Sequence, residues 1–496
     1  SIMNEQKNLF LAIGLSIAII VIFQFFMPST QPIQKSNIDN NEIIQPSTSI
    51  DEQTSTSVNI IKPKKEILNN NQRVFIETPM LKGSINLKGA ILDDLELSNY
   101  KISLDENSKN IELFLPDGTS NPYYVEIGWK QINETSIDLP NLETEWKSNS
   151  TMLSSDNNVV LSWKNNQNIT FNITYEIDEN YMFSIKQEIF NGSNKTIDVF
   201  PYRLIKRINT PDTINFFILH EGLISLLNDE LLEKDYDDLI DDCSSANTTK
   251  NLYCDNKSQG GWLGFTDKYW MSVLIPDPTK PINVNYRHGN NGRDNYRTGY
   301  VGQIFNINPA QSISYNGHLF AGAKNLNILN NYKKTLSIPR FNDAIDWGWF
   351  SFLTKPISHA INWFYGYVGN FGLAIIAFTI LMRLILFPLA HTSFKSMAKM
   401  KKLQPEMKQL KETYPDDRKK MQQELMALYK REGANPVAGC LPIMVQIPIF
   451  FSLYKVLFVT IEMYHAPFYG WIHDLSAPDP LGLITLFGIF PWDFPS

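Results

Sequence analysis

The chain has 496 residues, a net charge of −7 and a hydrophobic fraction of 43%. This length exceeds that of a typical single domain, and a mean hydropathy of −0.21 is too polar for a wholly embedded transporter. Three cysteines are too few for a disulfide scaffold, and none has a spacing typical of a zinc site. We therefore expect a membrane part and a large water-soluble part in one chain, without a metal or other cofactor.

The N-terminal segment is the first apolar run. Residues 9–27 carry no charge, and at about 1.5 Å per helical residue they match the ~30 Å core of a bilayer. We assign residues 1–27 to an uncleaved transmembrane anchor, with a cleavable signal peptide as the alternative. Residues 28–72 are rich in Ser, Thr, Asn, Gln and Pro, which is typical of a flexible linker, here a periplasmic one.

The next part of the chain has the pattern of β-strands. Apolar and polar residues alternate without a break from Ile169 to Ile177, and the alternation resumes at Tyr181 after the turn residues 178–180. Such a pair of half-buried strands predicts an antiparallel hairpin. With shorter stretches of the same kind, it predicts an all-β, sandwich-like periplasmic domain over residues 73–335.

Residues 336–369 are dense in aromatic side chains and poor in charge, and they precede an apolar run. Aromatic residues gather where a helix lies at the membrane surface, so this region predicts an interfacial amphipathic helix. A core helix of the β domain is the alternative. The aromatic residues are Trp347, Trp349, Trp363, Tyr365 and Tyr367.

Two further spans are predicted, at 370–390 and 437–461, with a basic segment between them at 391–436. This segment holds eleven Lys and Arg residues against six Asp and Glu residues, in a chain that is acidic as a whole. By the positive-inside rule it belongs in the cytoplasm, and its apolar periodicity predicts a helical hairpin. Residues 462–496 then form a periplasmic loop. The lysines of the hairpin include Lys395, Lys399, Lys401, Lys402, Lys408 and Lys411. We interpret these lysines first as a signal of topology and a solvated face of the hairpin. The second interpretation is contact with anionic lipid, ribosomal RNA or an arriving chain.

One charge lies inside the first of these spans. Arg383 is about seven residues, roughly 10 Å, from the cytoplasmic end of its helix, and Gln446 lies at a similar depth in the next span. Neither span contains an acidic residue. A buried cation without a counter-ion costs several kcal/mol, which favours a hydrated groove open to the cytoplasm. The alternative is that Arg383 snorkels to the headgroups, and we assign that behaviour to Lys455 at the periplasmic end.

The cysteines differ in their surroundings. Cys243 and Cys254 lie in one polar stretch, so a periplasmic location allows either a single disulfide or two free thiols. Cys440 lies in an apolar segment, where a small packing residue is expected. No H-E-x-x-H or G-x-S-x-G motif occurs, and the nearest phosphate-loop match, Gly317 to Lys324, lacks the Gly-Lys-Ser/Thr ending. We therefore expect no enzymatic activity.

Four stretches resemble the YidC family of bacterial membrane protein insertases. They are GNFGLAIIAFTILMRLILFPLAHTSFKSMAKMKKLQPEMKQLKE, QQELMALYKREGANPVAGCLPIMVQIPIFFSLYKVL, APFYGWIHDLSAPDP and the GGWLGFTDKYW block at 260–270. The resemblance implies an α+β membrane protein of the bacterial inner membrane that inserts and helps to fold other membrane proteins. Its members have two further spans and a basic tail beyond the position of Ser496, so the resemblance implies that this sequence is C-terminally incomplete, either as a fragment or as a truncated gene model.

The family's site residues fall on specific positions of this chain. The resemblance implies a groove arginine at Arg383, polar groove neighbours at Thr379 and Gln446, and a substrate-contacting helix. The implied partners are nascent inner-membrane proteins, the Sec translocase, membrane lipids and, as a further candidate, the ribosome. The residues implied for the substrate-contacting helix are Ile447, Pro448 and Phe450.

Two other functional classes fit parts of the pattern. The first is a membrane-anchored periplasmic protein that binds or acts on carbohydrates, because the family's periplasmic domain resembles sugar-mutarotase-type sandwiches; fold alone does not establish that activity. The second is an ion channel or transporter, which predicts more spans and internal repeats than this sequence contains.

Overall fold

The computed structural model describes residues 61–131, 137–214, 218–244, 254–415, 417–433 and 441–477. The predicted N-terminal anchor and the predicted linker up to residue 60 lie outside these residues, and so does Cys440.

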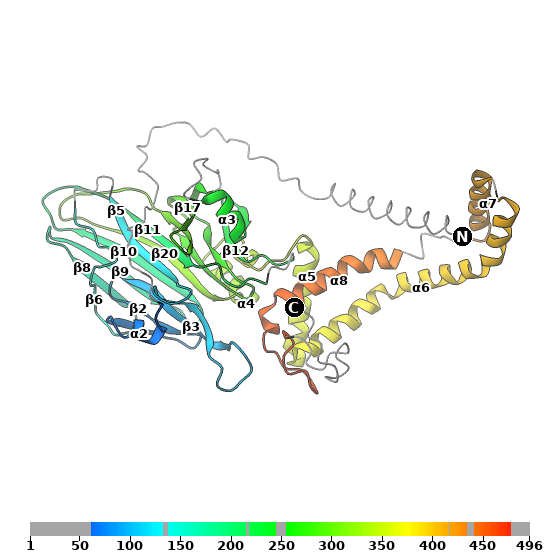
Figure 1. Ribbon diagram of the computed structural model, residues 1–496, viewed down its shortest axis with the longest axis horizontal. Coiled ribbons are helices and arrows are strands. Elements are labelled where there is room, and N and C mark those ends of the chain that lie inside the picture. The colour runs from blue at the N-terminus through cyan, green and yellow to red at the C-terminus, as the bar shows by residue number, and fades with distance from the viewer. Residues whose placement is uncertain are drawn as a thin grey trace. The chain divides into compact units, whose positions relative to one another are not determined.

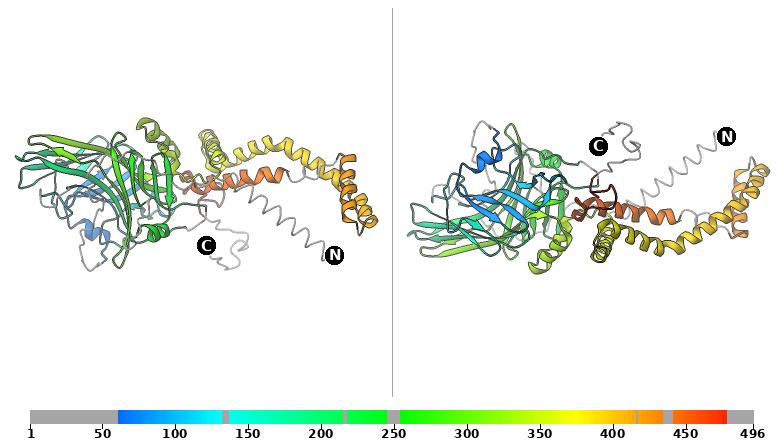
Figure 2. Two further views of the ribbon diagram at one scale, coloured as in Figure 1. Left: turned by 90° about the horizontal axis from the view of Figure 1, so that it is seen from above. Right: turned by 90° about the horizontal axis from the view of Figure 1, so that it is seen from below.

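The strands form two antiparallel-rich sheets that face each other as a sandwich (Figures 1 and 2). Within the described residues, the larger sheet has eleven strands with the main order β14-β17-β18-β11-β5-β3-β2-β1-β7, while β19 pairs with β11 and β4 with β3. Its strands are β1 (Arg73–Glu77), β2 (Leu81–Asn86), β3 (Ile91–Lys101), β4 (Asn110–Phe114), β5 (Tyr123–Gln131), β7 (Met152–Leu153), β11 (Ile197–Ile208), β14 (Asp255–Gln259), β17 (Pro281–Asn290), β18 (Asp294–Val301) and β19 (Phe305–Ile307).

The second sheet has nine strands in the described residues, in the order β13-β12-β15-β16-β20-β10-β9-β8-β6. A short helix, α3 (Tyr236–Cys243), follows β13. The strands are β6 (Lys147–Ser148), β8 (Val159–Lys164), β9 (Ile169–Ile177), β10 (Met182–Asn191), β12 (Gly222–Leu227), β13 (Glu230–Lys234), β15 (Trp262–Thr266), β16 (Trp270–Pro276) and β20 (Ser312–Ala323).

The hairpin predicted from alternation is confirmed. β9 and β10 pair antiparallel, with Phe183 opposite Ile177 and Asn191 opposite Ile169. The odd-numbered residues of β9 are all buried, because the pleat of a strand turns alternate side chains to the same face. This face contributes to the core between the two sheets.

Polar groups also connect the sheets across the core. The hydroxyl of Tyr286 on β17 donates a 2.8 Å hydrogen bond to Ser225 on β12. Elsewhere in the core, Gln187 on β10 donates to the carbonyl of Gly128 and accepts from Arg203, both at 2.8 Å. Since buried polar groups are stable only when they are paired, these bonds favour one relative placement of the two sheets.

The predicted linker is too long at its C-terminal end. A short helix, α2 (Lys64–Leu68), falls inside it. The ammonium of Lys64 lies 2.9 Å from Asp94, 2.7 Å from Glu96 and 3.0 Å from Glu112. Composition predicted a solvated chain here, because α2 has no completely buried side chain. The helix is held instead by the ion pairs of Lys64 with distant strands.

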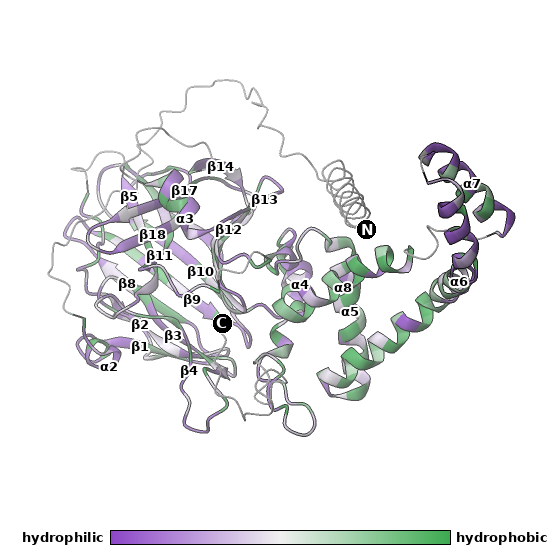
Figure 3. Ribbon diagram, turned by 45° about the vertical axis from the view of Figure 1, so that its right-hand side comes forward, coloured by the Kyte–Doolittle hydropathy of each residue, from purple (hydrophilic) through white to green (hydrophobic). Residues whose placement is uncertain are grey.

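After β20, the regular elements of the described residues are helices. They are α4 (Leu326–Thr335), η1 (Phe341–Ala344), α5 (Ser351–Val368), α6 (Phe371–Thr413), α7 (Arg418–Arg431), α8 (Leu441–Val459) and η3 (Ile461–Met463). By length and composition, α6 and α8 are each able to cross a membrane. Figure 3 shows that α6 changes from hydrophobic to hydrophilic along its length and that α7 is mainly hydrophilic.

α6 is longer than a membrane requires. Its 43 residues run without interruption from the predicted span into the first half of the predicted hairpin, through Pro388 and Pro405. Only its N-terminal half is apolar enough to cross a bilayer, and its C-terminal half is polar. The sequence predicted a separate helix here because the composition changes, but a change of composition does not by itself end a helix.

Candidate functional site

Three helices pack together around the start of α6. Asn370 caps α6 by accepting a hydrogen bond from the backbone N–H of Leu373, and its amide donates to the carbonyl of Pro467 at 3.1 Å. An apolar cluster then joins α5, α6 and α8. Its buried members are Ile357, Ile361, Phe371, Ala374, Phe378, Val456 and Met463. The contacts therefore lie at the beginning of α6 and the end of α8.

The residues predicted for the groove lie farther along these helices. Arg383, Thr379 and Gln446 are all exposed. The Thr379 hydroxyl donates to the carbonyl of Ile375 on its own helix at 2.8 Å, and Arg383 makes no hydrogen bond or ion pair within the described residues. The structure thus places these residues on helix faces that α5 and the other described elements leave uncovered, without a direct contact between Arg383 and Gln446.

The predicted substrate-contacting residues follow Gln446 within about one turn of α8. Ile447 and Phe450 are 49% and 66% exposed, and Pro448 is partly buried. Exposure of these apolar side chains to water would be unfavourable. On a helix that spans a membrane, they are the expected lipid-facing surface. They give α8 an apolar face on which another apolar segment can lie.

α7 packs back against the polar half of α6. Leu403 packs against Leu428 and Tyr429, and Arg431 of α7 lies 3.0 Å from Glu406 of α6. The six lysines predicted to mark this hairpin are all exposed. The hairpin therefore presents a basic, solvated surface whose two helices are joined by a small apolar contact.

Sequence reasoning missed an ion pair at the other end of α8. The ammonium of Lys455 lies 2.6 Å from the carboxylate of Asp346 and also contacts the carbonyl of Ile218. The carboxylate accepts hydrogen bonds from the backbone N–H groups of His220 at 2.8 Å and Gly348 at 3.0 Å. The expectation that Lys455 snorkels to the headgroups is therefore wrong. Its counter-ion comes from the segment before α5, more than a hundred residues away, which a search within the spans could not find.

A second buried lysine lies near this pair. Lys324 follows β20, is almost completely buried, and donates a 2.9 Å hydrogen bond to the hydroxyl of Thr266. Burial lowers the pKa of Lys324 to about 8, although the carboxylates of Asp346 and Asp267 act in the opposite direction. The end of the sandwich that contacts α8, here called its base, therefore holds Lys324, Lys455 and Asp346, and the Asp346 carboxylate acts on both lysines.

Residues just beyond α8 also contact the sandwich. The amide of Asn325 donates a 2.9 Å hydrogen bond to Glu462, and burial raises the pKa of Glu462 to about 7. The ring of Tyr464 lies 5.1 Å from that of Tyr269 and 5.3 Å from that of Trp270, in edge-to-face geometry. Polar and aromatic contacts together fix the end of α8 to the base of the sandwich.

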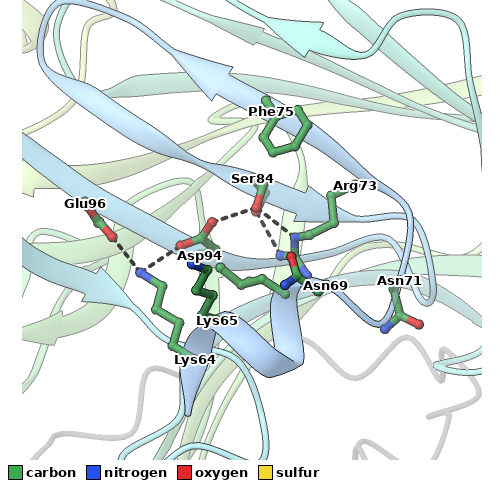
Figure 4. A pocket seen from close by; sticks show the side chains of 10 residues that line it. Lys64, Lys65, Asn69, Asn71, Arg73, Phe75, Ser84, Asp94 and Glu96 are labelled. Carbon is green, nitrogen blue, oxygen red and sulfur yellow. Dashed lines mark hydrogen bonds and ion pairs between the residues drawn. The ribbon is translucent and has the colours of Figure 1, made fainter.

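A pocket of about 500 Å³ lies between α2 and the strands β1 to β3 (Figure 4). The charged side chains that line it bind one another: Arg73 donates to Ser84 at 2.7 Å, and Ser84 donates to Asp94 at 2.6 Å. Burial lowers the pKa of Lys64, but its ion pairs with Glu96 and Asp94 outweigh this effect and raise it above the ordinary value. The charges of this pocket hold α2 in place.

The remaining candidate groups are cysteines and metal ligands. Cys243 and Cys254 form a disulfide bond. Their Cα atoms are 5.7 Å apart, a separation that is typical of disulfides. No group of three or more His, Cys, Asp or Glu side chains suited to a metal ion occurs in the described part of the chain.

Comparison with known proteins covers almost the whole chain. Residues 73–360 match the family model described as the YidC periplasmic domain, and residues 363–492 match the 60Kd inner membrane protein model. The chain is 43% identical to the membrane protein insertase YidC of Rickettsia felis over 99% of this chain and 86% of that protein. It is 42% identical to that of Granulibacter bethesdensis, over 99% of this chain and 84% of the relative.

Solved structures give weaker likenesses. An active YidC insertase crystal structure is 20% identical, with a TM-score of 0.29, and covers 82% of this chain and 77% of that one. A galactose mutarotase-related enzyme from Lactobacillus acidophilus is 9% identical, with a TM-score of 0.33, over 50% of this chain and 97% of that one. The two family models and the identity with curated relatives establish that the chain belongs to the YidC family of membrane protein insertases.

Proposed function

We propose that this protein inserts other proteins into the bacterial inner membrane and helps them to fold there, without covalent chemistry. The observation that carries the proposal is the 43% identity to a membrane protein insertase over 99% of the chain. The carbohydrate-active alternative has no such support from sequence identity.

The exposed faces of α6 and α8 are the part of the molecule that suits this activity. The two helices contact each other through residues near the start of α6 and the end of α8, so the faces that carry Arg383 and Gln446 are free to meet a client. A charged group at the bilayer centre costs about 2.5–3.5 kcal/mol on insertion scales. Water beside Arg383 lowers that cost for a polar client tail, and the guanidinium attracts acidic residues of the tail.

The apolar part of the client follows a different route. Ile447 and Phe450 form a lipid-like surface on α8, so a hydrophobic segment can lie against them and then move sideways into the bilayer. Burial of about twenty apolar residues in lipid drives this step. For acidic tails the membrane potential adds about 2.3 kcal/mol per charge per 100 mV, so no nucleotide is required.

The topology that fits this mechanism places the sandwich in the periplasm and the α6–α7 hairpin in the cytoplasm. The excess of Lys and Arg in residues 391–436 supports this orientation. The exposed lysines of the hairpin then face arriving nascent chains and, with them, the ribosome and anionic lipid. The Sec translocase is the further partner that the family relationship suggests.

Reconstitution tests the proposal. The chain, extended by the C-terminal part of a close relative, is placed in proteoliposomes, and a small single-span client with a short translocated tail is synthesised beside them. Protease-protected client should accumulate severalfold above the level in protein-free liposomes. Equal protection in both preparations would refute the insertase assignment, and a parallel sugar titration that saturated would favour the carbohydrate alternative.

A further inference from the structure

The hairpin between β3 and β4 carries two exposed apolar side chains at its tip. Ile102 is 58% exposed and Leu104 is 53% exposed. They are two residues apart and separated by Ser103. These aliphatic side chains at the loop tip do not contribute to the core of the sandwich, and they are available to an apolar partner.

The tip has a defined conformation. The backbone N–H of Ile102 donates to the carbonyl of Lys109 at 2.9 Å, and that of Ser103 donates to the hydroxyl of Ser108 at 2.9 Å. The N–H of Ser108 in turn donates to the carbonyl of Asp105 at 2.9 Å. Because these bonds close the loop upon itself, its apolar side chains are displayed on an ordered scaffold rather than on a free segment.

The base of the same hairpin is attached to the end of α8. The hydroxyl of Tyr464 donates a 2.7 Å hydrogen bond to the carbonyl of Lys101, and a ring nitrogen of His465 lies 3.1 Å from the same oxygen. α8 ends at Val459, five residues before Tyr464. If α8 crosses the membrane, the surface of the bilayer lies within a few residues of this attachment, so the tip of the hairpin is within reach of lipid.

Two aromatic residues of the segment after α8 strengthen this placement. Tyr469 and Trp471 are exposed, on either side of Gly470, whose positive φ of 71° allows the tight turn between them. Tyrosine and tryptophan are favoured at the level of the headgroups, where one edge of the ring is apolar and the other is wet. The segment that holds the hairpin therefore has the composition of a membrane interface.

The charges of the hairpin decide the kind of membrane contact. Lys101 and Lys109 are balanced by Asp105 and Glu106, and the Lys101 ammonium donates to the carbonyl of Glu106 at 2.8 Å. Such a loop gains little from the negative potential of anionic lipid. Its contact with a bilayer rests on the burial of aliphatic side chains, and it is independent of headgroup charge.

We propose that the β3–β4 tip inserts Ile102 and Leu104 into the outer leaflet of the membrane that α8 spans, and so seats the sandwich on the lipid surface. The proposal rests on the proposed function only in its assignment of α8 as a span with the sandwich at its periplasmic end. The occupant of the apolar tip is lipid, because the hairpin is bonded to the residues that follow the span.

Site-specific labels in lipid test this proposal. In a Cys440→Ser background with the disulfide kept oxidised, Leu104→Cys is labelled with an environment-sensitive nitrobenzoxadiazole fluorophore and reconstituted into neutral phosphatidylcholine vesicles. The control is Asn166→Cys in the exposed turn between β8 and β9. The register of β9 on β10, and of β10 on β20, places that turn at the end of the sheet opposite to Lys324 and the α8 attachment. Leu384→Cys on α6 is the control for a membrane-embedded position.

We expect nitroxide lipids labelled near the headgroup to quench the fluorophore at residue 104 at least twofold more than the one at residue 166, equally with and without 0.5 M NaCl. Equal quenching at both positions would overturn the proposal. A blue-shifted but unquenched label at residue 104 would also overturn it, since that outcome indicates a protein partner. A lack of quenching at residue 384 would instead overturn the assignment of the spans, and the seating of the tip would fall with it.

Discussion

The ammonium of Lys455, near the end of an apolar helix, lies 2.6 Å from the carboxylate of Asp346 in the segment before α5. Both side chains are largely shielded from water, and the stem of Lys455 packs beside Gly348. Since two backbone N–H groups also donate to Asp346, the carboxylate has partners on several sides. This pair couples the position of α8 to that of the sandwich.

Removal of one partner of this pair should destabilise the protein. Lys455→Met leaves the Asp346 carboxylate buried without a counter-ion, and broken buried pairs typically cost about 3–5 kcal/mol. Asp346→Asn should cost a comparable amount, but the double variant should lose less than the sum, because neither charge then remains alone. Unfolding of the purified parent and variants in detergent measures the loss of unfolding free energy in each single variant and in the double variant.

Lys455→Arg is the matched control for that cycle. It keeps the positive charge and should retain most of the stability, with a small loss because the guanidinium is larger than the ammonium. Additive single effects in the double variant would show that Lys455 and Asp346 do not interact, and the coupling described above would be refuted.

Glu462 should make stability depend on pH. Burial raises the pKa of this carboxyl from 4.5 to about 7, so the folded state binds the proton more tightly than the unfolded state. The stabilising effect of that proton is complete below about pH 4.5 and is lost as the pH rises through about 7; the full difference is on the order of 3 kcal/mol. Glu462→Gln, which still accepts from Asn325, should therefore melt at a higher temperature than the parent at pH 8.

The two proteins should melt at nearly the same temperature at pH 5, where the parent carboxyl is protonated. Asn325→Ala is a useful comparison, since it removes the hydrogen-bond donor but leaves the buried carboxyl to titrate. If the melting temperatures of the parent and Glu462→Gln kept a constant difference from pH 5 to pH 8, Glu462 would not be the titrating group.

The disulfide between Cys243 and Cys254 should be present in protein exported to the periplasm. Alkylation of denatured, unreduced protein should then modify Cys440 alone, while prior reduction should expose two more thiols. Reaction of three thiols without reduction would contradict this prediction. Loss of a disulfide typically costs about 2–5 kcal/mol in small secreted domains, so Cys243→Ser with Cys254→Ser should lower the melting temperature of the sandwich.

The orientation of the hairpin can be measured in intact spheroplasts. A protease added outside should digest the sandwich but spare residues 391–436, because we propose that the basic hairpin lies in the cytoplasm. Digestion of the hairpin under these conditions would reverse the orientation and remove the basis for a groove open to the cytoplasm. Permeabilised spheroplasts, in which the hairpin should be cut, provide the control for protease access.

Local patterns predicted much of the fold. The alternation from Ile169 to Ile177 gave a strand with the same bounds and the same buried face, since period-two alternation is a direct consequence of pleating. Within the described residues, the apolar runs likewise located two long helices that are able to cross a membrane by length and composition. Motif resemblance identified the family, which the identity with curated relatives confirms.

Local sequence patterns did not predict the contacts between distant segments of the chain. The partner of Lys455 could not be found, because Asp346 lies 109 positions earlier and nothing in either segment indicates that they meet. The ion pairs that hold α2 were missed for the same reason, and the linker was predicted too long. Contacts of Tyr464 with Lys101 and Trp270 also join segments that are far apart in sequence, so only the three-dimensional structure brings them together.

The positive charge of Arg383 is the central feature of the proposed groove. Arg383 lies on an exposed face of α6 and has no ion-pair partner among the described residues, and we propose that its charge attracts an acidic client tail. Arg383→Lys should keep that attraction and insert clients at a near-normal rate. Arg383→Ala should slow the insertion of clients with acidic translocated tails, and Arg383→Glu should slow it further by repulsion, while both should spare clients whose tails lack acidic residues.

The most direct measurement compares the insertion rates of two clients that differ only in the charge of the tail, in proteoliposomes containing the parent or the Arg383→Glu variant of the C-terminally extended protein. The parent and the variant are reconstituted in equal amounts. The melting temperature of the sandwich confirms beforehand that both are folded. The account predicts that Arg383→Glu lowers the rate for the acidic-tailed client about tenfold or more relative to the neutral-tailed client. Equal rates for the acidic-tailed client in the parent and the variant would contradict it, and Arg383 would then be a residue that extends its charge to the headgroups.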